Sequence, residues 1–175
     1  MKHYILFASL IAFLLFSCSE EIIDTDKVVQ EIKSSTSLTE NVTSTLCGEI
    51  KFKLEGDHVR HFYCDSYMGD GGSELNSYFY KNKLIYAEYY SFYDGPMPTE
   101  DGEYTAGGEA TGDKYRIYFE NEKMVKCFKN DKVITDLNPE QPDYDPNPAE
   151  LVDFAHKVVK AMNTKESEVL CDRWF

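Results

Sequence analysis

Three segments of this chain repeat one order of residue types, and that order restricts the fold more than any other feature of the sequence. Residues 80–85, 119–125 and 128–134 each run from an aromatic residue through a charged residue and an asparagine to lysine and two aliphatic residues. Asparagine tolerates the left-handed backbone angles of tight hairpin turns, and the flanking aromatic and aliphatic residues suit paired strands. The repeat therefore predicts an antiparallel meander over residues 75–135.

A further hairpin is predicted upstream of the repeat. Residues 49–54 alternate polar and apolar side chains, residues 55–57 form a turn, and residues 59–67 resume an extended, aromatic stretch. Residues 68–73 are rich in glycine and are expected to form a loop rather than a strand. The meander itself is expected to be interrupted by a long loop over residues 94–113, where glycine and proline are dense.

An amphipathic helix is predicted near the C-terminus. Asn147 is a natural N-cap, Pro148 suits the first helical position, and Glu150 can complete a capping box. The helix is expected to end at Asn163. Its apolar face should pack on the sheet and consists of Leu151, Phe154, Ala155, Val158, Val159 and Met162. The predicted fold class is therefore α+β, mainly an antiparallel meander sheet with a C-terminal helix packed on it and a possible short N-terminal helix.

The N-terminus has the pattern of a secretion signal. A short basic start is followed by an apolar run over residues 4–16, which is too short to remain as a membrane-spanning helix. Residues 15–18, Leu-Phe-Ser-Cys, resemble the lipobox of bacterial lipoproteins, in which a cysteine receives lipid before the signal is cleaved. The resemblance implies a signal peptide over residues 1–17 and lipidation of Cys18, which would tether the protein to a membrane.

The residues after the lipobox narrow the expected location. Residues 19–21, Ser-Glu-Glu, are similar to the acidic tract that follows the lipid-bearing cysteine in surface-exposed lipoproteins of the Bacteroidetes type. With the lipobox, the repeated turns and the C-terminal helix, they make the chain resemble the small outer-membrane lipoproteins of such bacteria. The resemblance implies the outer membrane, on its periplasmic side or on the cell surface, and it implies no activity.

One folded domain is expected on this anchor. Residues 18–46 are rich in Ser, Thr, Glu and Lys and are interpreted as a lipid-anchored tether that is partly helical. A short helix in this tether is predicted to begin after Asp24 or Asp26. Residues 47–175 are interpreted as a single β-rich domain that includes the C-terminal helix.

Four cysteines remain after Cys18, namely Cys47, Cys64, Cys127 and Cys171. In an oxidising compartment this even number favours two disulfides, although the sequence alone leaves their pairing open. We favour Cys47 with Cys64, because a hairpin turn at residues 56–57 would bring them nearly opposite, and this leaves Cys127 with Cys171. A zinc site would need paired Cys-x-x-Cys spacings, which the sequence does not contain.

The sequence contains no recognisable catalytic or cofactor motif, so no enzyme activity, cofactor or metal is expected. His58, His61 and Cys64 are spaced three residues apart, which on a strand places successive members on opposite faces. Residues 143–147 imitate the start of a calcium loop but lack the glycine and glutamate that such a loop needs. A formal net charge of −13 disfavours binding to nucleic acid.

Aromatic residues are so frequent in residues 78–93 that one face of a small sheet could not bury them all. Alternation along a strand should send about half of them outward, so Tyr86, Tyr89 and Tyr93 are interpreted as a candidate ligand face. The alternative is that both faces are covered, one by the C-terminal helix and the other by the N-terminal segment.

Together these features predict a membrane-anchored, non-catalytic binding module of the cell envelope that recognises a protein, peptide or glycan. One alternative is an inhibitor or immunity protein, because a strongly acidic protein suits a basic enzyme as its target. A second alternative is a structural or assembly lipoprotein, which is expected if both sheet faces are covered. A hydrolase with carboxylate chemistry would need a deep cleft with converging acids.

Overall fold

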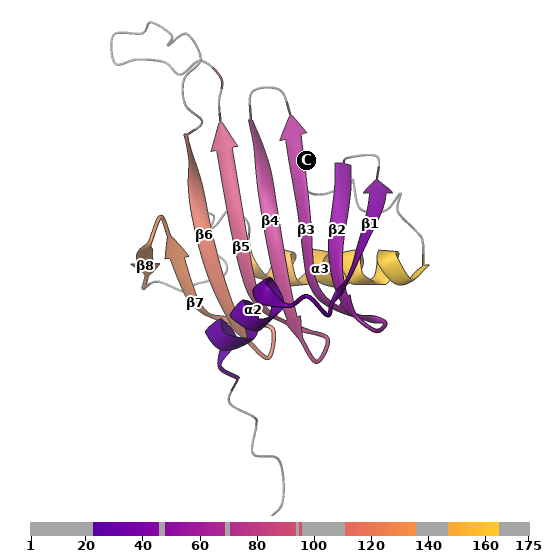
Figure 1. Cartoon of the computed structure of the whole chain (residues 1–175). Coiled ribbons are helices and arrows are strands. Elements are labelled where there is room, and N and C mark those ends of the chain that lie inside the picture. The colour runs from indigo at the N-terminus through magenta and orange to yellow at the C-terminus, as the bar shows by residue number, and fades with distance from the viewer. Residues whose placement is uncertain are drawn as a thin grey trace, which may run out of the picture.

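The computed structural model of the chain describes residues 23–45, 48–68, 71–93, 95, 111–135 and 147–164. Eight strands form one antiparallel sheet whose spatial order follows the sequence order (Figure 1). The strands are β1 (Thr39–Thr45), β2 (Gly48–Glu55), β3 (His58–Met68), β4 (Gly71–Tyr80), β5 (Lys83–Tyr93), β6 (Thr111–Glu120), β7 (Lys123–Lys129) and β8 (Lys132–Ile134). Helices α2 (Thr25–Ser34) and α3 (Pro148–Thr164) lie on opposite sides of this sheet. The predicted α+β class, with a meander sheet and a C-terminal helix, is confirmed.

The three repeated segments form tight hairpin turns, as predicted. Both central residues of each turn have positive φ: 50° and 63° at Lys81 and Asn82, 47° and 62° at Asn121 and Glu122, and 49° and 65° at Asn130 and Asp131. Two successive positive φ values are typical of type I′ turns, whose twist matches that of the flanking strands. The Asn130 side chain also fastens its turn to β6, because it accepts a hydrogen bond from the Lys114 N–H and donates one to Asp113, both at 2.8 Å.

A β-bulge beside one of these turns decides which residues face α2. Phe79 pairs with Leu84 and Tyr78 pairs with Tyr86, so Ile85 is an extra residue in β5. A bulge interrupts the alternation of side chains between the two faces of a sheet. Consequently Ile85 and Tyr86 both belong to the cluster beneath α2, although they are neighbours in sequence.

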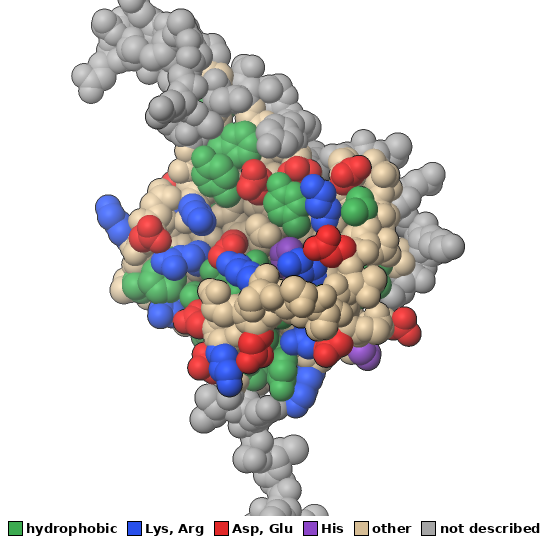
Figure 2. All heavy atoms as spheres, viewed as in Figure 1, with side chains coloured by type: hydrophobic (Ala, Val, Ile, Leu, Met, Phe, Trp, Pro, Cys, Tyr) green, Lys and Arg blue, Asp and Glu red, His purple; other side chains and the backbone are tan. Residues whose placement is uncertain are grey.

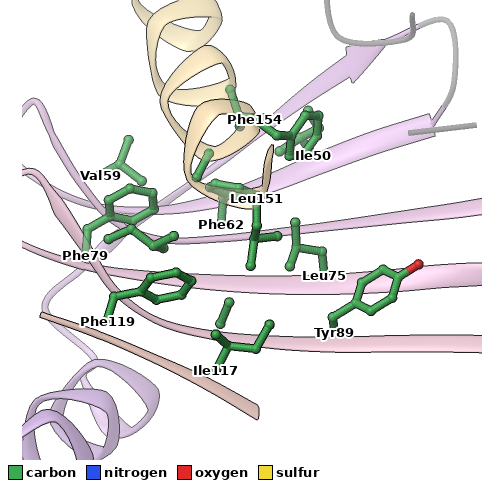
Figure 3. Packing of buried hydrophobic residues seen from close by; sticks show 14 of the residues in the cluster. Ile50, Val59, Phe62, Leu75, Phe79, Tyr89, Ile117, Phe119, Leu151 and Phe154 are labelled. Carbon is green, nitrogen blue, oxygen red and sulfur yellow. The ribbon is translucent and has the colours of Figure 1, made fainter. Parts of the chain in front are cut away.

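The main hydrophobic core lies between the sheet and α3, on the side that we call the α3 face (Figure 3). Alternate residues of β2 to β7 point to this side. Phe62 is fully buried there, with ring centroids 5.9 Å from Phe79 and 6.4 Å from Phe154. Burial of each such side chain stabilises the fold by roughly 1.5–3 kcal/mol. The contribution of α3 to this core is Leu151, Phe154, Ala155, Val158 and Ala161.

The start of α3 matches the sequence prediction. The N–H of Ala149 donates a hydrogen bond to Oδ1 of Asn147 at 2.9 Å, so Asn147 is the N-cap, and Pro148 is the first helical residue. The predicted apolar face is correct, although Ala161 was not predicted to be part of it. The helix ends at Thr164, one residue later than expected.

A smaller cluster lies on the other side of the sheet, which we call the α2 face. Val29 and Ile32 of α2 pack there against Tyr78, Ile85 and Tyr86. Asp24 caps the helix, because its side chain accepts a hydrogen bond from the Lys27 N–H at 3.1 Å. The predicted N-terminal helix is therefore present and is folded back on the sheet.

Two stretches that the sequence suggested were irregular are strands. Residues 39–45, interpreted as part of the tether, form β1, and β1 is polar because an edge strand has little to bury. Gly71 and Gly72, expected in a loop, begin β4 instead. Gly72 pairs with Phe92, and a Cβ on Gly72 would lie 2.9 Å from the Phe92 ring. The Ser66 carbonyl oxygen would lie closer still, at 2.3 Å, so the glycine is required by close packing within the sheet and not by a turn. The expected 94–113 loop is also shorter than predicted, because β6 already begins at Thr111.

Two of the four cysteines of the predicted disulfides, Cys64 and Cys127, lie among the described residues. Cys64 and Cys127 both have free thiols, while Cys18, Cys47 and Cys171 lie outside the described residues, as does the predicted signal. The reason for favouring Cys47 as the partner of Cys64 was a nearly opposite position in the first hairpin. The ladder instead pairs Cys64 with Ile50, which removes that reason.

Replacing Gly72 tests the close packing around the start of β4. A Cβ at this position would lie 2.3 Å from the Ser66 carbonyl oxygen, so the backbone must move in Gly72→Ala. We expect the free energy of unfolding to fall by about 2–3 kcal/mol in chemical denaturation. The neighbouring Ser73→Ala change should cost less than about 1 kcal/mol. Equal stability of Gly72→Ala and the unmodified chain would contradict this packing.

Candidate functional site

Helix α2 covers only part of its side of the sheet. It packs near the hairpin turns, where Tyr78, Ile85 and Tyr86 are buried. Toward the other ends of the strands, no helix among the described residues covers the sheet (Figures 1 and 2). We call this uncovered part the open face. Its side chains are those of Lys51, Tyr63, Asp65, Glu74, Asn76, Glu88, Tyr90, Phe92, Lys114, Arg116 and Phe128.

The strand register arranges the open face in two rows that cross the sheet. The first row, from β2 to β7, is Lys51, Tyr63, Asn76, Glu88, Arg116 and Phe128. The second row, from β3 to β6, is Asp65, Glu74, Tyr90 and Lys114. Neighbours in a row have Cβ atoms about 4.5–5.5 Å apart, so adjacent side chains can contact one ligand together. Acidic, basic and apolar side chains are therefore intermixed, as Figure 2 shows above α2.

A hollow of about 270 Å³ lies in the middle of the open face. Glu74, Asn76, Glu88, Tyr90 and Lys114 line it, and the main chain at Tyr89 forms part of its floor because the Tyr89 ring points to the α3 face. Carboxylates, an amide, an ammonium group and an aromatic ring thus converge on one shallow space. Such a set of donors, acceptors and apolar surface fits a polar ligand.

The carboxylate of Glu88 is held in place at one wall of the hollow. Its Oε1 accepts hydrogen bonds from the Lys33 ammonium at 3.1 Å and from the Tyr86 hydroxyl at 3.0 Å. Lys33 belongs to the last turn of α2, so this contact joins the covered and open parts of the α2 face. Burial and the nearby Glu88 charge raise the pKa of Tyr86, which keeps its hydroxyl a donor. Glu88 is therefore presented to the hollow in a fixed orientation.

Asn76 is oriented in a similar way by His61. The His61 Nε2 atom lies 3.0 Å from Oδ1 of Asn76, and the His61 ring lies 4.6 Å from the Tyr78 ring. Burial lowers the pKa of His61 to about 4, so the imidazole is neutral at pH 7. A neutral imidazole that donates from Nε2 to the amide oxygen leaves the amide N–H groups of Asn76 for other partners.

Aromatic rings flank the polar centre of the open face. Tyr63 donates a hydrogen bond to Asp65 at 3.2 Å, and the Lys51 ammonium lies 5.6 Å from the Tyr63 ring centroid. On the other side, the rings of Tyr90 and Phe92 are stacked with centroids 5.3 Å apart. These half-buried rings give the face flat apolar surface beside its charged groups.

The predicted ligand face of Tyr86, Tyr89 and Tyr93 is wrong as a set. Tyr86 is buried beneath α2 and Tyr89 is buried in the core on the α3 face, whereas Tyr93 is 40% exposed. Residues 86 and 89 are three apart on a strand, so they point to opposite faces. Counting by twos from Tyr86 would have found Glu88 and Tyr90, the residues of β5 that do line the hollow.

The remaining sequence candidates do not assemble into a reactive site. His61 lies on the α2 face and Cys64 packs against the α3-face core, so this pair diverges as predicted, and His58 contacts Asn82 at 3.1 Å. Burial raises the pKa of the Cys64 thiol to about 12 and disfavours its thiolate. Across the described residues, no three His, Cys, Asp or Glu side chains are close enough together to hold a metal ion. Residues 143–146 of the calcium-like motif lie outside them.

A second hollow, of about 330 Å³, lies at the turn end of the sheet. It is lined by Ile23 and Thr25 at the start of α2 and by residues of two hairpins, including Lys83 and Asn121, which are joined by a 2.8 Å hydrogen bond. Its lining includes the apolar side chains of Ile23, Leu84, Ile85 and Phe119, and two of its polar groups already contact one another. The open face is therefore the stronger candidate for ligand binding.

Comparison with known proteins finds no match to this chain among protein families, curated proteins or solved structures. Among the helices that the structure describes, none combines the length and apolar character needed to cross a bilayer.

The pKa of His61 makes stability depend on pH. The unfolded chain protonates this residue near its ordinary pKa of 6.5, whereas the folded chain resists protonation until about pH 4. The free energy of unfolding should therefore fall by at most about 3 kcal/mol as the pH drops through this window, and be unaffected above it. Denaturation at several pH values should show that His61→Gln removes this part of the decline. An identical decline in the variant would contradict the burial of His61.

Proposed function

We propose that the protein is a non-catalytic binding module of the cell envelope and that its ligand binds on the open face. The observation that carries the proposal is the convergence of Glu74, Asn76, Glu88, Tyr90 and Lys114 on one hollow in a sheet face that α2 leaves uncovered. Side chains at such positions contribute little to the core. Their combination of charge and aromatic surface is better explained by contact with a partner.

The chemistry of the open face favours a ligand with both polar groups and a flat apolar surface. The carboxylates accept hydrogen bonds, Lys114 donates them, and Tyr90 and Phe92 offer rings on which an apolar surface can stack. A segment of a protein, a peptide or a glycan has these properties. A ligand that is only anionic would be repelled by Glu74 and Glu88, and an entirely apolar one would leave them desolvated.

Binding without catalysis suits the arrangement of Glu88. Its carboxylate is already engaged by the Lys33 ammonium and the Tyr86 hydroxyl, which hold it as a fixed acceptor. The hollow is also shallow and open to water along the sheet, whereas acid and base catalysis generally depend on an enclosed, water-excluded site. These features favour recognition over proton transfer.

We further propose that a lipid on Cys18 anchors the module to the outer membrane. Helix α2 begins at Thr25, seven residues after Cys18, so an extended connection would span at most about 25 Å. The module would then stay close to the membrane surface, on the periplasmic side or outside the cell, where its partners must lie.

Anchoring is tested by replacing the modified residue. In cells supplied with an alkynyl fatty acid, the unmodified chain should become labelled and sediment with the outer membrane. Cys18→Ser should lose the label and leave the membrane fraction, because no acyl chain remains to hold it. A Cys18→Ser chain that remains in the outer membrane would show that another part of the chain attaches it.

Ligand binding is tested by comparing variants in affinity capture from the solubilised envelope of the host. The double variant Glu74→Gln with Tyr90→Ser should lose a captured component, with affinity reduced about tenfold or more, because a charged acceptor and a ring are both removed. Glu150→Gln, at an exposed position of α3, should retain the captured component. Circular dichroism checks that each variant is folded. A component retained equally by all the chains would place the binding site elsewhere.

A further inference from the structure

The two edges of the sheet differ in how they are protected from pairing with another strand. Edge β8 has only three residues and begins with Lys132, and both shortness and lysine discourage strand addition. Edge β1 has seven residues and pairs with β2 from Thr39 to Thr45 without a bulge. Its sequence, Thr-Glu-Asn-Val-Thr-Ser-Thr, contains neither lysine nor proline. Among the described residues, no strand pairs with its outer side.

Edge β1 also exposes an apolar side chain. Val42 lies at the centre of the strand and is 53% exposed. Alternate residues of an edge strand direct their N–H and C=O groups away from the sheet, so β1 offers a row of unused backbone donors and acceptors around Val42. A long, straight edge of this kind is a template for a further strand.

We propose that β1 pairs antiparallel with β1 of a second copy of the chain, around a two-fold axis at Val42. In this register Val42 lies opposite Val42 of the partner subunit. Asn41 lies opposite Thr43 of the partner subunit, and Glu40 lies opposite Ser44 of the partner subunit. All seven residues are paired only in this register, because any shift leaves residues unpaired at both ends. The strand is thus nearly symmetric about its central valine.

Charge favours the same arrangement. Glu40 is the only charged residue of β1, and it would face a small neutral side chain. The two Glu40 carboxylates would be four residues apart along the strand direction, about 14 Å, which exceeds the Debye length of about 8 Å at physiological salt. A parallel pairing in register would instead place Glu40 beside the partner's Glu40, with like charges in contact. The antiparallel pair is therefore the self-complementary one.

The dimer would extend the proposed binding surface. A two-fold axis perpendicular to a sheet keeps the same face of both copies on the same side. Both α2 helices and both open faces would then lie on one side of a continuous sheet. The result is a surface with two equivalent hollows, which would bind a repetitive ligand more tightly than one copy does.

The test measures the mass of the full chain in an excess of detergent micelles by sedimentation or native mass spectrometry. The unmodified chain should become dimeric as its concentration is raised to about 100 μM. Val42→Lys should raise the dissociation constant about tenfold or more, because two lysines would meet at the axis. Val133→Lys is the matched control, since Val133 is 55% exposed on the other edge strand, and it should leave dimerisation unchanged.

Two further variants make the result decisive. Ser44→Pro should abolish dimerisation, because residue 44, like Val42, directs its N–H away from β2, and proline has no N–H to donate to the partner's strand. Val42→Cys should give a disulfide-linked dimer on mild oxidation, above the background of the unmodified chain, whereas Val133→Cys should not. An unmodified chain that remains monomeric at all concentrations overturns the proposal. So does a dimer that Val42→Lys and Ser44→Pro leave intact.

Discussion

The alternation of side chains along each strand is the constraint on which the rest of this structure depends. A sheet of eight strands has two faces, and each must be buried or made compatible with water. Helix α3 buries the first against Phe and aliphatic side chains such as Phe62, Phe79 and Ile117. Helix α2 has only ten residues and buries part of the second. The uncovered remainder is the open face, so the candidate site follows from an unequal cover of the two faces.

Tyrosine makes this partial cover stable. Tyr78, Tyr86 and Tyr118 lie on the α2 face, where a ring can be buried while its hydroxyl reaches a polar partner. Tyr86 donates to Glu88 at 3.0 Å, and Tyr118 donates to Asp26 of α2 at 3.0 Å. Tyr86 therefore both packs beneath α2 and orients a carboxylate of the hollow. This explains why tyrosine, rather than phenylalanine, marks the boundary between covered and open sheet.

Much of the fold could be predicted from local sequence, because its turns and its C-terminal helix have local causes. The left-handed angles of Asn82, Asn121 and Asn130 and the N-cap at Asn147 depend on neighbouring residues alone. Strand β1 and the start of β4 could not be predicted, since a polar edge and a glycine beneath Phe92 have causes elsewhere in the sheet. The site was missed because Tyr86 and Tyr89, three residues apart on one strand, were assigned to one face, and because the sequence does not show where the cover by α2 ends.

The central claim, that α2 covers one part of its sheet face and leaves the other part open, is tested most directly by hydroxyl-radical labelling of the tyrosines. Mass spectrometry of the labelled full chain should show that Tyr63 and Tyr90, half-buried on the open face, are oxidised faster than Tyr78 and Tyr86, which are 3% and 4% exposed beneath α2. Rapid oxidation of Tyr78 and Tyr86 would mean that α2 does not cover the sheet. If Tyr63 and Tyr90 were as well protected as Tyr78 and Tyr86, the open face would be closed in solution.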